Sequence, residues 1–173
     1  MKKAAVLALV LAACLAAAWG DEVKVQANTP FTYACLECSG SYAQIPAKVE
    51  EFIGEFFKQG LMPAGAMIGL YMNSYDQVKS EAELKWLVGF PVAADAQVAA
   101  PLKKAEYKFT WVAYYLHKGP VDKVAESYGK ITQFLEANGY KVAGPCLERY
   151  LDNPQMVKPE EMRTEILFPV EKK

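Results

Sequence analysis

The feature that most constrains this chain is an internal repeat with an offset of 79 residues. The stretch GAMIGLYMNSY at 65–75 aligns without a gap with GPCLERYLDNP at 144–154. Under the same offset VKSE falls on VKPE, and after a one-residue gap FPV falls on a second FPV. This agreement predicts a duplication, with repeat one at 31–92 and repeat two at 104–170. Two copies are too few for a solenoid, so we expect a pseudo-two-fold pair that shares one core.

Each repeat has the pattern of a strand, a helix and two further strands. The first strand is rich in aromatic residues, FTYACLEC in repeat one and EYKFTWVAYYLHK in repeat two. A helix with one apolar stripe follows and ends at the glycine of KQGL or ANGY. The segment 93–105 is predicted to be a linker. The predicted fold is therefore α+β, with tandem β-α-β-β units forming a sheet-rich domain that has its helices on one side and a central cleft.

The N-terminus has the pattern of an export signal. Lys2 and Lys3 precede the apolar run AAVLALVLAACLAAAW, and polar DEVKV follows at once. Cleavage after Gly20 would remove a signal peptide at 1–20 and leave a linker at 21–30 before the domain at 31–173. Alternatively, LAAC resembles a bacterial lipobox, and cleavage there would leave Cys14 lipidated. The pattern favours a periplasmic or extracellular protein, with membrane attachment only through Cys14.

The charge of the exported chain argues against nucleic-acid binding. Loss of Lys2 and Lys3 leaves 17 basic residues against 20 acidic ones, a net charge of about −3. Domains that bind nucleic acid instead carry a basic patch or stripe. We therefore expect a small-molecule partner and no nucleic-acid partner.

A soluble exported form keeps three cysteines, Cys35, Cys38 and Cys146. The first two form a CxxC pair within a predicted strand, where residues three apart point to opposite faces and lie roughly 10 Å apart. His117 is the only histidine, which leaves too few ligands for a tetrahedral zinc site. The sequence predicts core thiols, no metal and no cofactor. A bond from Cys146 to either of the other two cysteines remains open.

Glu148 is the residue that distinguishes the two repeats, because Gly69 stands at its position in repeat one. Strand alternation places Glu148 on the same face as Tyr150, and places Ile68 and Leu70 of repeat one on the opposite, apolar face. We expect the helices to cover the apolar face, so that Glu148 points away from them into a cleft between the repeats. Gly69 would leave room in that cleft.

Aromatic side chains are expected to border the same space, among them Trp86 at the start of a strand and Trp111, which alternates with Phe109 and Tyr115 along one face of another strand. A buried carboxylate is costly without a partner. Ring faces attract cations by about 0.5–2 kcal/mol each. The combination favours an amphipathic ligand that is cationic or aromatic. The alternative is structural: Glu148 accepts hydrogen bonds from a tyrosine or a lysine, or faces water at a rim.

The second repeat carries the spaced pattern HKGP, a helix, NGY, GP, E-x-Y, an NP turn, TEI and PV. Together with GLYMNSY in repeat one, this pattern resembles the GyrI-like small-molecule-binding domains, also called effector-binding domains of AraC- and MerR-type multidrug regulators. The resemblance runs from about Phe31 to Val170. It implies a duplicated β-α-β-β fold with a central cleft, a ligand-contacting glutamate at Glu148 beside Tyr150, and a pocket tyrosine at Tyr71.

The chain departs from the family in the loop after Tyr71, where Ser74-Tyr75 replaces a DP-like pair. Relatives are often fused to DNA-binding helices, for which the roughly ten residues between the signal and Phe31 leave no room. The resemblance therefore implies a stand-alone exported form.

Three functions are compatible with these features. The leading hypothesis is a non-enzymatic protein that binds small cationic or aromatic compounds through Glu148 and aromatic side chains. The alternative is a hydrolase of reactive electrophilic natural products, because some GyrI-like proteins resemble such enzymes and a buried glutamate suits a general base. Tetrapyrrole binding is the third, because SOUL-type haem proteins share the duplicated architecture. His117 precedes KGP, a position more typical of a turn residue than of a haem ligand.

Overall fold

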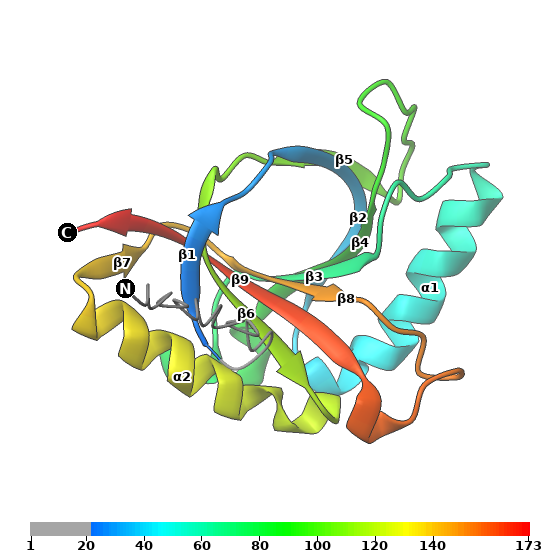
Figure 1. The fold of residues 1–173 in the computed structure, drawn as a ribbon. Helices are drawn as coiled ribbons and strands as arrows, with labels where there is room; N and C mark the ends of the chain where they lie inside the picture. The colour runs from blue at the N-terminus through cyan, green and yellow to red at the C-terminus, as the bar shows by residue number, and fades with distance from the viewer. Residues whose placement is uncertain (1–21) are drawn as a thin grey trace, which may run out of the picture.

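The computed structural model describes residues 22–173, so the predicted signal peptide and Cys14 lie outside the described residues. The described chain forms one antiparallel sheet system and two helices, which confirms the α+β class (Figure 1). Its elements are β1 (Lys24–Ala27), β2 (Phe31–Ser39), α1 (Ile45–Lys58), β3 (Met67–Tyr71), β4 (Lys85–Pro91), β5 (Lys103–Tyr107), β6 (Trp111–Lys118), α2 (Val124–Ala137), β7 (Tyr140–Val142), β8 (Cys146–Tyr150) and β9 (Arg163–Lys172).

The strand order in the sheet is β1-β6-β9-β8-β3-β4-β2-β5, with β7 pairing to β9. Both edge strands correct the sequence-based reading. β1 lies in the segment 21–30 and β5 begins in the segment 93–105, and both segments were predicted to be linkers. The single strand expected at EYKFTWVAYYLHK is also interrupted, because β5 ends at Tyr107 and β6 begins at Trp111. KVQA and KKAEY are short and polar, as edge strands often are, and so lack the apolar runs that identify central strands.

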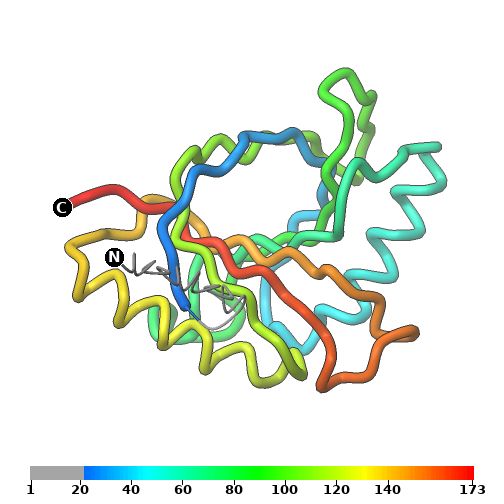
Figure 2. The backbone as a smooth tube through the Cα atoms, viewed as in Figure 1, coloured from blue at the N-terminus to red at the C-terminus, as the bar shows by residue number. Residues whose placement is uncertain are grey.

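Each edge strand pairs away from its neighbour in sequence. β1 precedes β2 in the chain but pairs with β6, whereas β5 precedes β6 but pairs with β2. The segments that follow β1 and β5 are tied to each other, since the Asn28 backbone N–H donates to the Thr110 carbonyl at 2.8 Å and the Asn28 side chain donates to the Phe109 carbonyl at 2.7 Å. The sheet curls as a result, and the tube through the Cα atoms shows its edges bending round (Figure 2).

One row of paired residues crosses the sheet from Val88 through Gly69, Glu148 and Ile166 to Tyr115. Val88 belongs to the core cluster under α1, and Ile166 and Tyr115 belong to the cluster under α2. The whole row therefore lies on the face that the helices cover. The expectation that Glu148 points away from the helices was wrong.

The opposite face explains the error. The adjacent row of Leu87, Leu70, Leu147 and Leu167 is buried together with Tyr107 in a separate core cluster on the concave side of the curled sheet. Both faces of the sheet are apolar, one covered by helices and the other by the curl of the sheet itself. Strand alternation separates two faces but does not say which one a helix covers.

The two helices dock through the residues that the sequence pattern selects. α1 buries Phe52 and Phe56, and α2 buries Ile131 and Leu135. Each helix is followed by a glycine with positive φ, Gly60 at 69° and Gly139 at 70°, so both predicted helix ends are confirmed. Neither helix in residues 22–173 has the length and apolar character needed to cross a membrane.

Candidate functional site

Glu148 is buried at 3% exposure and is held by three tyrosine hydroxyls. Tyr128 of α2 donates to Oε1 at 2.5 Å, and Tyr150 of β8 donates to Oε2 at 2.8 Å. Tyr71 of β3 lies 3.5 Å from Oε2 and 2.8 Å from the Tyr150 hydroxyl. The structure thus brings together the predicted residues Glu148, Tyr150 and Tyr71, and adds a fourth from a helix.

Gly69 is the direct cross-strand partner of Glu148 in the β3–β8 ladder. A Cβ atom at Gly69 would lie 2.8 Å from the Tyr150 hydroxyl oxygen and 3.2 Å from the Tyr71 hydroxyl oxygen. The missing side chain is what allows both phenols to approach the carboxylate. The glycine of one half and the glutamate of the other are therefore two parts of one site.

Burial dominates the electrostatics of this cluster. It raises the pKa of Glu148 above its ordinary value, and the hydrogen bonds from the three tyrosines offset part of the increase. Burial, and then the charge of Glu148, raises the pKa of Tyr71 and of Tyr150. Burial also raises the pKa of Tyr128. The phenols keep their protons and serve as donors to the carboxylate.

A second group of rings extends from Tyr71 toward the surface. The Tyr42 ring packs edge-on against Tyr71 with centroids 5.3 Å apart, and against exposed Tyr75 at 5.1 Å. Trp86 is buried behind Tyr42, at 6.2 Å between centroids, and its Nε1 donates to the Gly40 carbonyl at 3.1 Å. Trp86 therefore supports this aromatic group through Tyr42.

The structure places Trp111 away from the Glu148 cluster. It is 56% exposed at the start of β6 and borders a shallow apolar groove with Val25, Tyr140 and Val170. The residue of β6 in the same row as Glu148 is Tyr115, two strands away. Trp111 lies four residues before Tyr115, which is about 13 Å along the strand. Alternation identified the correct face of β6 but not the position along it.

Sequence reasoning missed Tyr128 and Tyr42 as site residues. Tyr128 falls on the apolar stripe of α2, where an aromatic residue is expected to be core, and its ring does pack against Phe168. Its hydroxyl could have indicated a role in the site, since a buried tyrosine O–H needs a hydrogen-bond acceptor such as Glu148. Arg149, on the opposite face, forms an ion pair with Glu165, as its strand position predicts.

The cysteines in the described chain, Cys35, Cys38 and Cys146, are free. Cys35 and Cys38 belong to core clusters on opposite faces of β2, which confirms the strand reading of CLEC. Burial raises the pKa of Cys35 to about 12 and that of Cys38 to about 11, so both thiols are poor nucleophiles. Residues 22–173 contain no cluster of three or more side chains able to hold a metal ion.

Two hydroxyls of the described residues are buried without a hydrogen-bond partner, those of Tyr107 and Thr164. Thr164 lies between His117 and Tyr150, because it is the register partner of both. His117 is on β6 rather than in a turn, and both of its ring nitrogens have partners, Ser127 and the Pro120 carbonyl.

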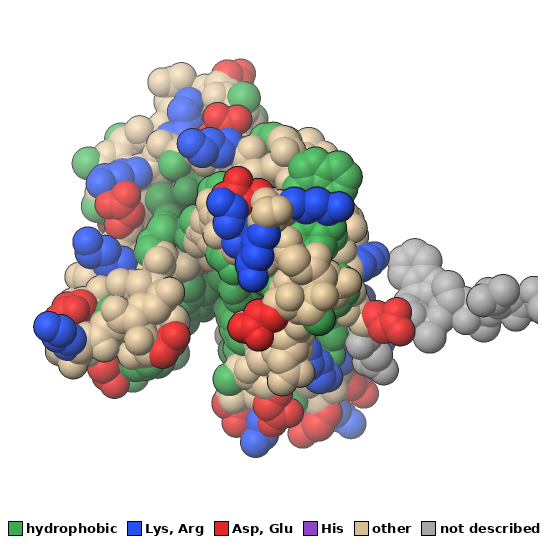
Figure 3. All heavy atoms as spheres, turned by 90° about the vertical axis from the view of Figure 1, so that its left-hand side faces the viewer, with side chains coloured by type: hydrophobic (Ala, Val, Ile, Leu, Met, Phe, Trp, Pro, Cys, Tyr) green, Lys and Arg blue, Asp and Glu red, His purple; other side chains and the backbone are tan. Residues whose placement is uncertain are grey.

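The molecular surface is hollowed between two lobes on the face seen in Figure 3, and hydrophobic side chains line the hollow. Lysine, arginine and acidic side chains alternate around it without a large region of one sign (Figure 3).

Comparison with solved structures places this arrangement among known folds. The EcmrR C-terminal domain is similar over 88% of this chain and 98% of that chain, with 20% identity and a TM-score of 0.76. SAV2435, solved bound to tetraphenylphosphonium, matches over 87% and 94%, with 16% identity and a TM-score of 0.63. A hydrolase encoded by lin2189 from Listeria innocua matches over 88% and 93%, with 13% identity and a TM-score of 0.67. At these identities the likeness concerns the fold.

Among curated proteins no match is found. The profile of the GyrI-like small molecule binding domain matches residues 21–171, which is nearly the whole described chain. This protein therefore belongs to the family of GyrI-like small-molecule-binding domains.

Proposed function

We propose that this protein binds lipophilic organic cations in a cleft between its two halves, with Glu148 as the counter-charge. The observation that carries the proposal is the set of Glu148 partners. They are phenol hydroxyls, and no ion pair within residues 22–173 involves Glu148. A buried carboxylate held by neutral donors still has a favourable interaction to gain from a cation.

The surrounding rings suit the same class of ligand. Tyr71, Tyr128 and Tyr150 bring three phenol rings to the carboxylate, and each residue is only partly buried. A delocalised cation with aromatic substituents would gain from ring faces as well as from the charge of Glu148. SAV2435, which has a similar fold, was solved with tetraphenylphosphonium, a ligand of this chemistry.

The duplication supports the location of the cleft. The series β2-α1-β3-β4 and β6-α2-β8-β9 have the same order apart from β7, which is inserted after α2 and has no counterpart in the first half. The two halves meet at the β3–β8 ladder. α1 and α2 flank this ladder on the face that carries Glu148. We propose that the halves arose by duplication, and that the second repeat acquired the acid while the first kept a glycine to make room for it.

Export is part of the proposal, since the N-terminal sequence has the pattern of a signal peptide at 1–20. The ligand would then be met in the periplasm or outside the cell, with lipidation at Cys14 as the alternative route to the membrane. We propose no nucleic-acid partner, in keeping with the mixed surface charge in Figure 3.

Calorimetric titration with tetraphenylphosphonium and with neutral triphenylphosphine oxide tests the binding function. The wild-type protein should prefer the cation, and Glu148→Gln should weaken cation binding by at least about tenfold while changing binding of the neutral compound little. Glu37→Gln is the matched control, because it removes one exposed carboxylate that pairs with Lys103 and not with the tyrosine cluster, and it should leave both affinities unchanged. Equal affinity of wild type and Glu148→Gln for the cation would refute the role of Glu148.

A second candidate function is favoured by the raised pKa of Glu148, because a raised pKa makes a carboxylate a stronger base. Glu148 would then activate water to open a strained, electrophilic ring. Incubation with an epoxide separates the two functions. Diol formation by the wild type, abolished in Glu148→Gln, would establish hydrolysis, whereas no turnover of a bound epoxide would exclude it for that class.

A further inference from the structure

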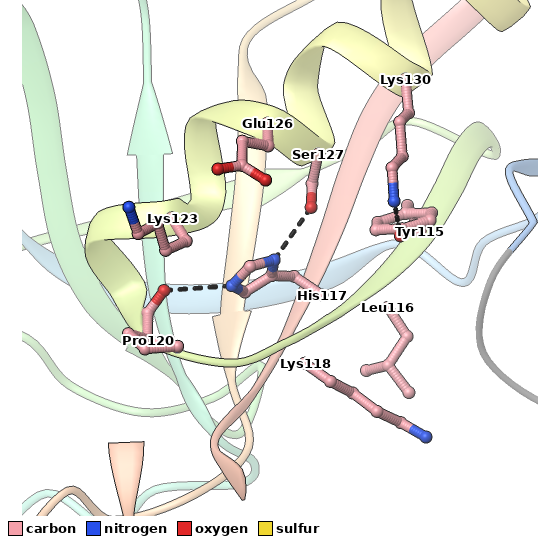
Figure 4. Close-up of a pocket in the computed structure, with 9 residues that line it drawn as sticks. All are labelled: Tyr115, Leu116, His117, Lys118, Pro120, Lys123, Glu126, Ser127 and Lys130. Carbon is pink, nitrogen blue, oxygen red and sulfur yellow. Dashed lines mark hydrogen bonds between the residues drawn. The ribbon is translucent and has the colours of Figure 1, made fainter. Parts of the chain in front are cut away.

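A separate cavity of about 280 Å³ lies between β6 and the start of α2 (Figure 4). Its lining includes Tyr115 and His117 from the strand and Ser127 and Lys130 from the helix, together with the charged residues Lys118, Lys123 and Glu126. Residues two apart on a strand share a face, and residues three apart on a helix share a side. The spacing of the two pairs thus gathers all four groups into one space.

Ser127 and His117 are hydrogen-bonded in this cavity, with Ser127 Oγ and His117 Nδ1 2.9 Å apart. The other ring nitrogen, Nε2, lies 3.1 Å from the Pro120 carbonyl oxygen. A carbonyl can only accept, so Nε2 must carry a proton. In the neutral ring Nδ1 is then an acceptor, and the Ser127 hydroxyl is its donor. The hydrogen bond therefore runs from the serine hydroxyl to a histidine nitrogen that can accept its proton, as in a serine nucleophile with a histidine base.

The hydrogen bonds of this pair are separate from those of the Glu148 cluster, although His117 is close enough for its charge to lower the pKa of Glu148. Ser127 and Tyr128 are consecutive on α2, and consecutive helical residues point about 100° apart. Tyr128 donates to Glu148, whereas Ser127 meets His117. Ser127 is 3% exposed and His117 is 6% exposed, and both border the cavity, so only a small part of each residue is open to a molecule that enters it.

Lys130, which lines the same cavity, supplies a positive charge. Lys130 Nζ donates to the Tyr115 hydroxyl at 2.9 Å and lies over the Tyr115 ring. This contact holds the ammonium group against the strand, on the same side of α2 as Ser127. An ammonium ion and a phenol placed there can stabilise negative charge that develops on a carbonyl oxygen.

We propose that Ser127 and His117 form a nucleophile and base pair that hydrolyses short-chain carboxylic esters. Ser127 Oγ attacks the ester carbonyl and its proton passes to His117 Nδ1, while the carbonyl electron pair moves to the oxygen facing Lys130. The intermediate collapses, the bond to the alcohol oxygen breaks, and His117 returns the proton to that oxygen. Water then attacks the acyl-serine with His117 as base, which releases the carboxylic acid and restores Ser127 Oγ–H.

The size of the cavity sets the substrate class. A volume of 280 Å³ is at or below the lower end of typical ligand pockets, which begin at about 300 Å³. Acetyl or propionyl esters fit this range better than long acyl chains. The Pro120 carbonyl orients the imidazole, in the position that a carboxylate occupies in a serine–histidine–aspartate triad.

The test uses p-nitrophenyl acetate and mapping of the acetylated residue by mass spectrometry. The wild type should release a burst of about one equivalent of p-nitrophenol and carry the acetyl group on Ser127. Ser127→Ala should abolish the burst, and Ser39→Ala should not, because Ser39 is an exposed serine on β2. His117→Asn keeps an acceptor for Ser127 but no base, and should slow acylation by about 10²- to 10⁴-fold.

Adduct mapping on the wild type also tests Ser127 as the acylated residue without Ser127→Ala, which covers the case in which that variant does not fold. Acetyl found on Ser127 at a rate that His117→Asn lowers would support the pair. A folded wild type with no acylated Ser127, or a burst that persists in folded Ser127→Ala, would overturn it.

Discussion

Gly69 and Glu148 face each other across the β3–β8 ladder, and the absence of a side chain at the first position creates the site of the second. A Cβ atom at Gly69 would lie 2.8 Å from the Tyr150 hydroxyl oxygen, closer than such contacts occur. The two aligned segments, 65–75 and 144–154, are thus complementary in composition, since the glycine of one makes room for the glutamate of the other.

Gly69→Ala should therefore damage the site more than a single methyl group suggests. Tyr150 or Tyr71 has to move from the carboxylate, and overpacking of this kind costs about 1–3 kcal/mol. Urea unfolding should show the loss of stability, and titration with tetraphenylphosphonium should show weaker binding. Unchanged values for both would mean that the tyrosines do not need the space.

Glu148→Gln should stabilise the protein at neutral pH while weakening cation binding. Burial raises the folded-state pKa of Glu148, so the native protein takes up a proton more readily than the unfolded chain. The penalty for ionised Glu148 is absent below the unfolded pKa and fully present above the folded pKa. Wild-type stability should fall as pH rises through that window. The difference in Tm between wild type and variant should be largest at neutral pH and should close in acid.

Tyr128→Phe should shift the pH dependence of ligand binding. Cation binding needs ionised Glu148 and is lost as pH falls through the pKa of that group. The hydrogen bond from Tyr128 lowers this pKa, so its removal raises the pKa and moves the loss of binding to higher pH. Affinity measured over a pH series gives the midpoint. A midpoint that stays in place would show that Tyr128 does not act on the carboxylate.

Thr164→Val should be neutral or stabilising by roughly 0.5–1 kcal/mol, because it removes a buried hydroxyl that has no partner among residues 22–173 and keeps the shape of the side chain. Thr164→Ala is the control, since it also removes a methyl group and should destabilise the fold by about 1 kcal/mol. Chemical denaturation compares the two. A clear loss in Thr164→Val would mean that the hydroxyl is bonded in solution.

Trp111→Ala should leave cation binding unchanged, although the sequence pattern placed Trp111 in the pocket. The side chain is exposed at the start of β6, four residues from the position that shares a row with Glu148. Substitutions of exposed residues usually change stability by less than about 0.5 kcal/mol. Intrinsic fluorescence follows folding and calorimetry follows binding. A tenfold loss of affinity would return Trp111 to the site.

Local patterns predicted the elements well where they bury apolar residues. The helix ends at Gly60 and Gly139, the strand at CLEC and the shared face of Glu148 and Tyr150 all follow from periodicity and glycine chemistry. The polar edge strands β1 and β5 were missed because their pairing partners are far away in sequence. The orientation of Glu148 toward the helices was missed because both faces of the sheet are buried.

The same distinction holds for the site. Glu148 and Tyr150 could be predicted because strand alternation places them on one face, and Tyr71 was implied by the family resemblance. The β3–β8 ladder brings the three together. Tyr128 could not, since it approaches from α2 and its place depends on how the helix docks. Ser127 and His117 lie ten residues apart and carry no recognisable motif, so only the packing of α2 on β6 reveals that they meet.

The exchanged pairing of β1 and β5 has a mechanical consequence. β1 of the first half pairs with β6 of the second, and β5 of the second half pairs with β2 of the first. The two halves are therefore hydrogen-bonded to each other at both ends of the sheet as well as in its middle. A hinge motion that separates the two halves would have to break the β1–β6, β2–β5 and β3–β8 ladders together. A ligand should therefore enter through movement of aromatic side chains and loops. The sheet backbone should superimpose closely between the ligand-free and ligand-bound protein.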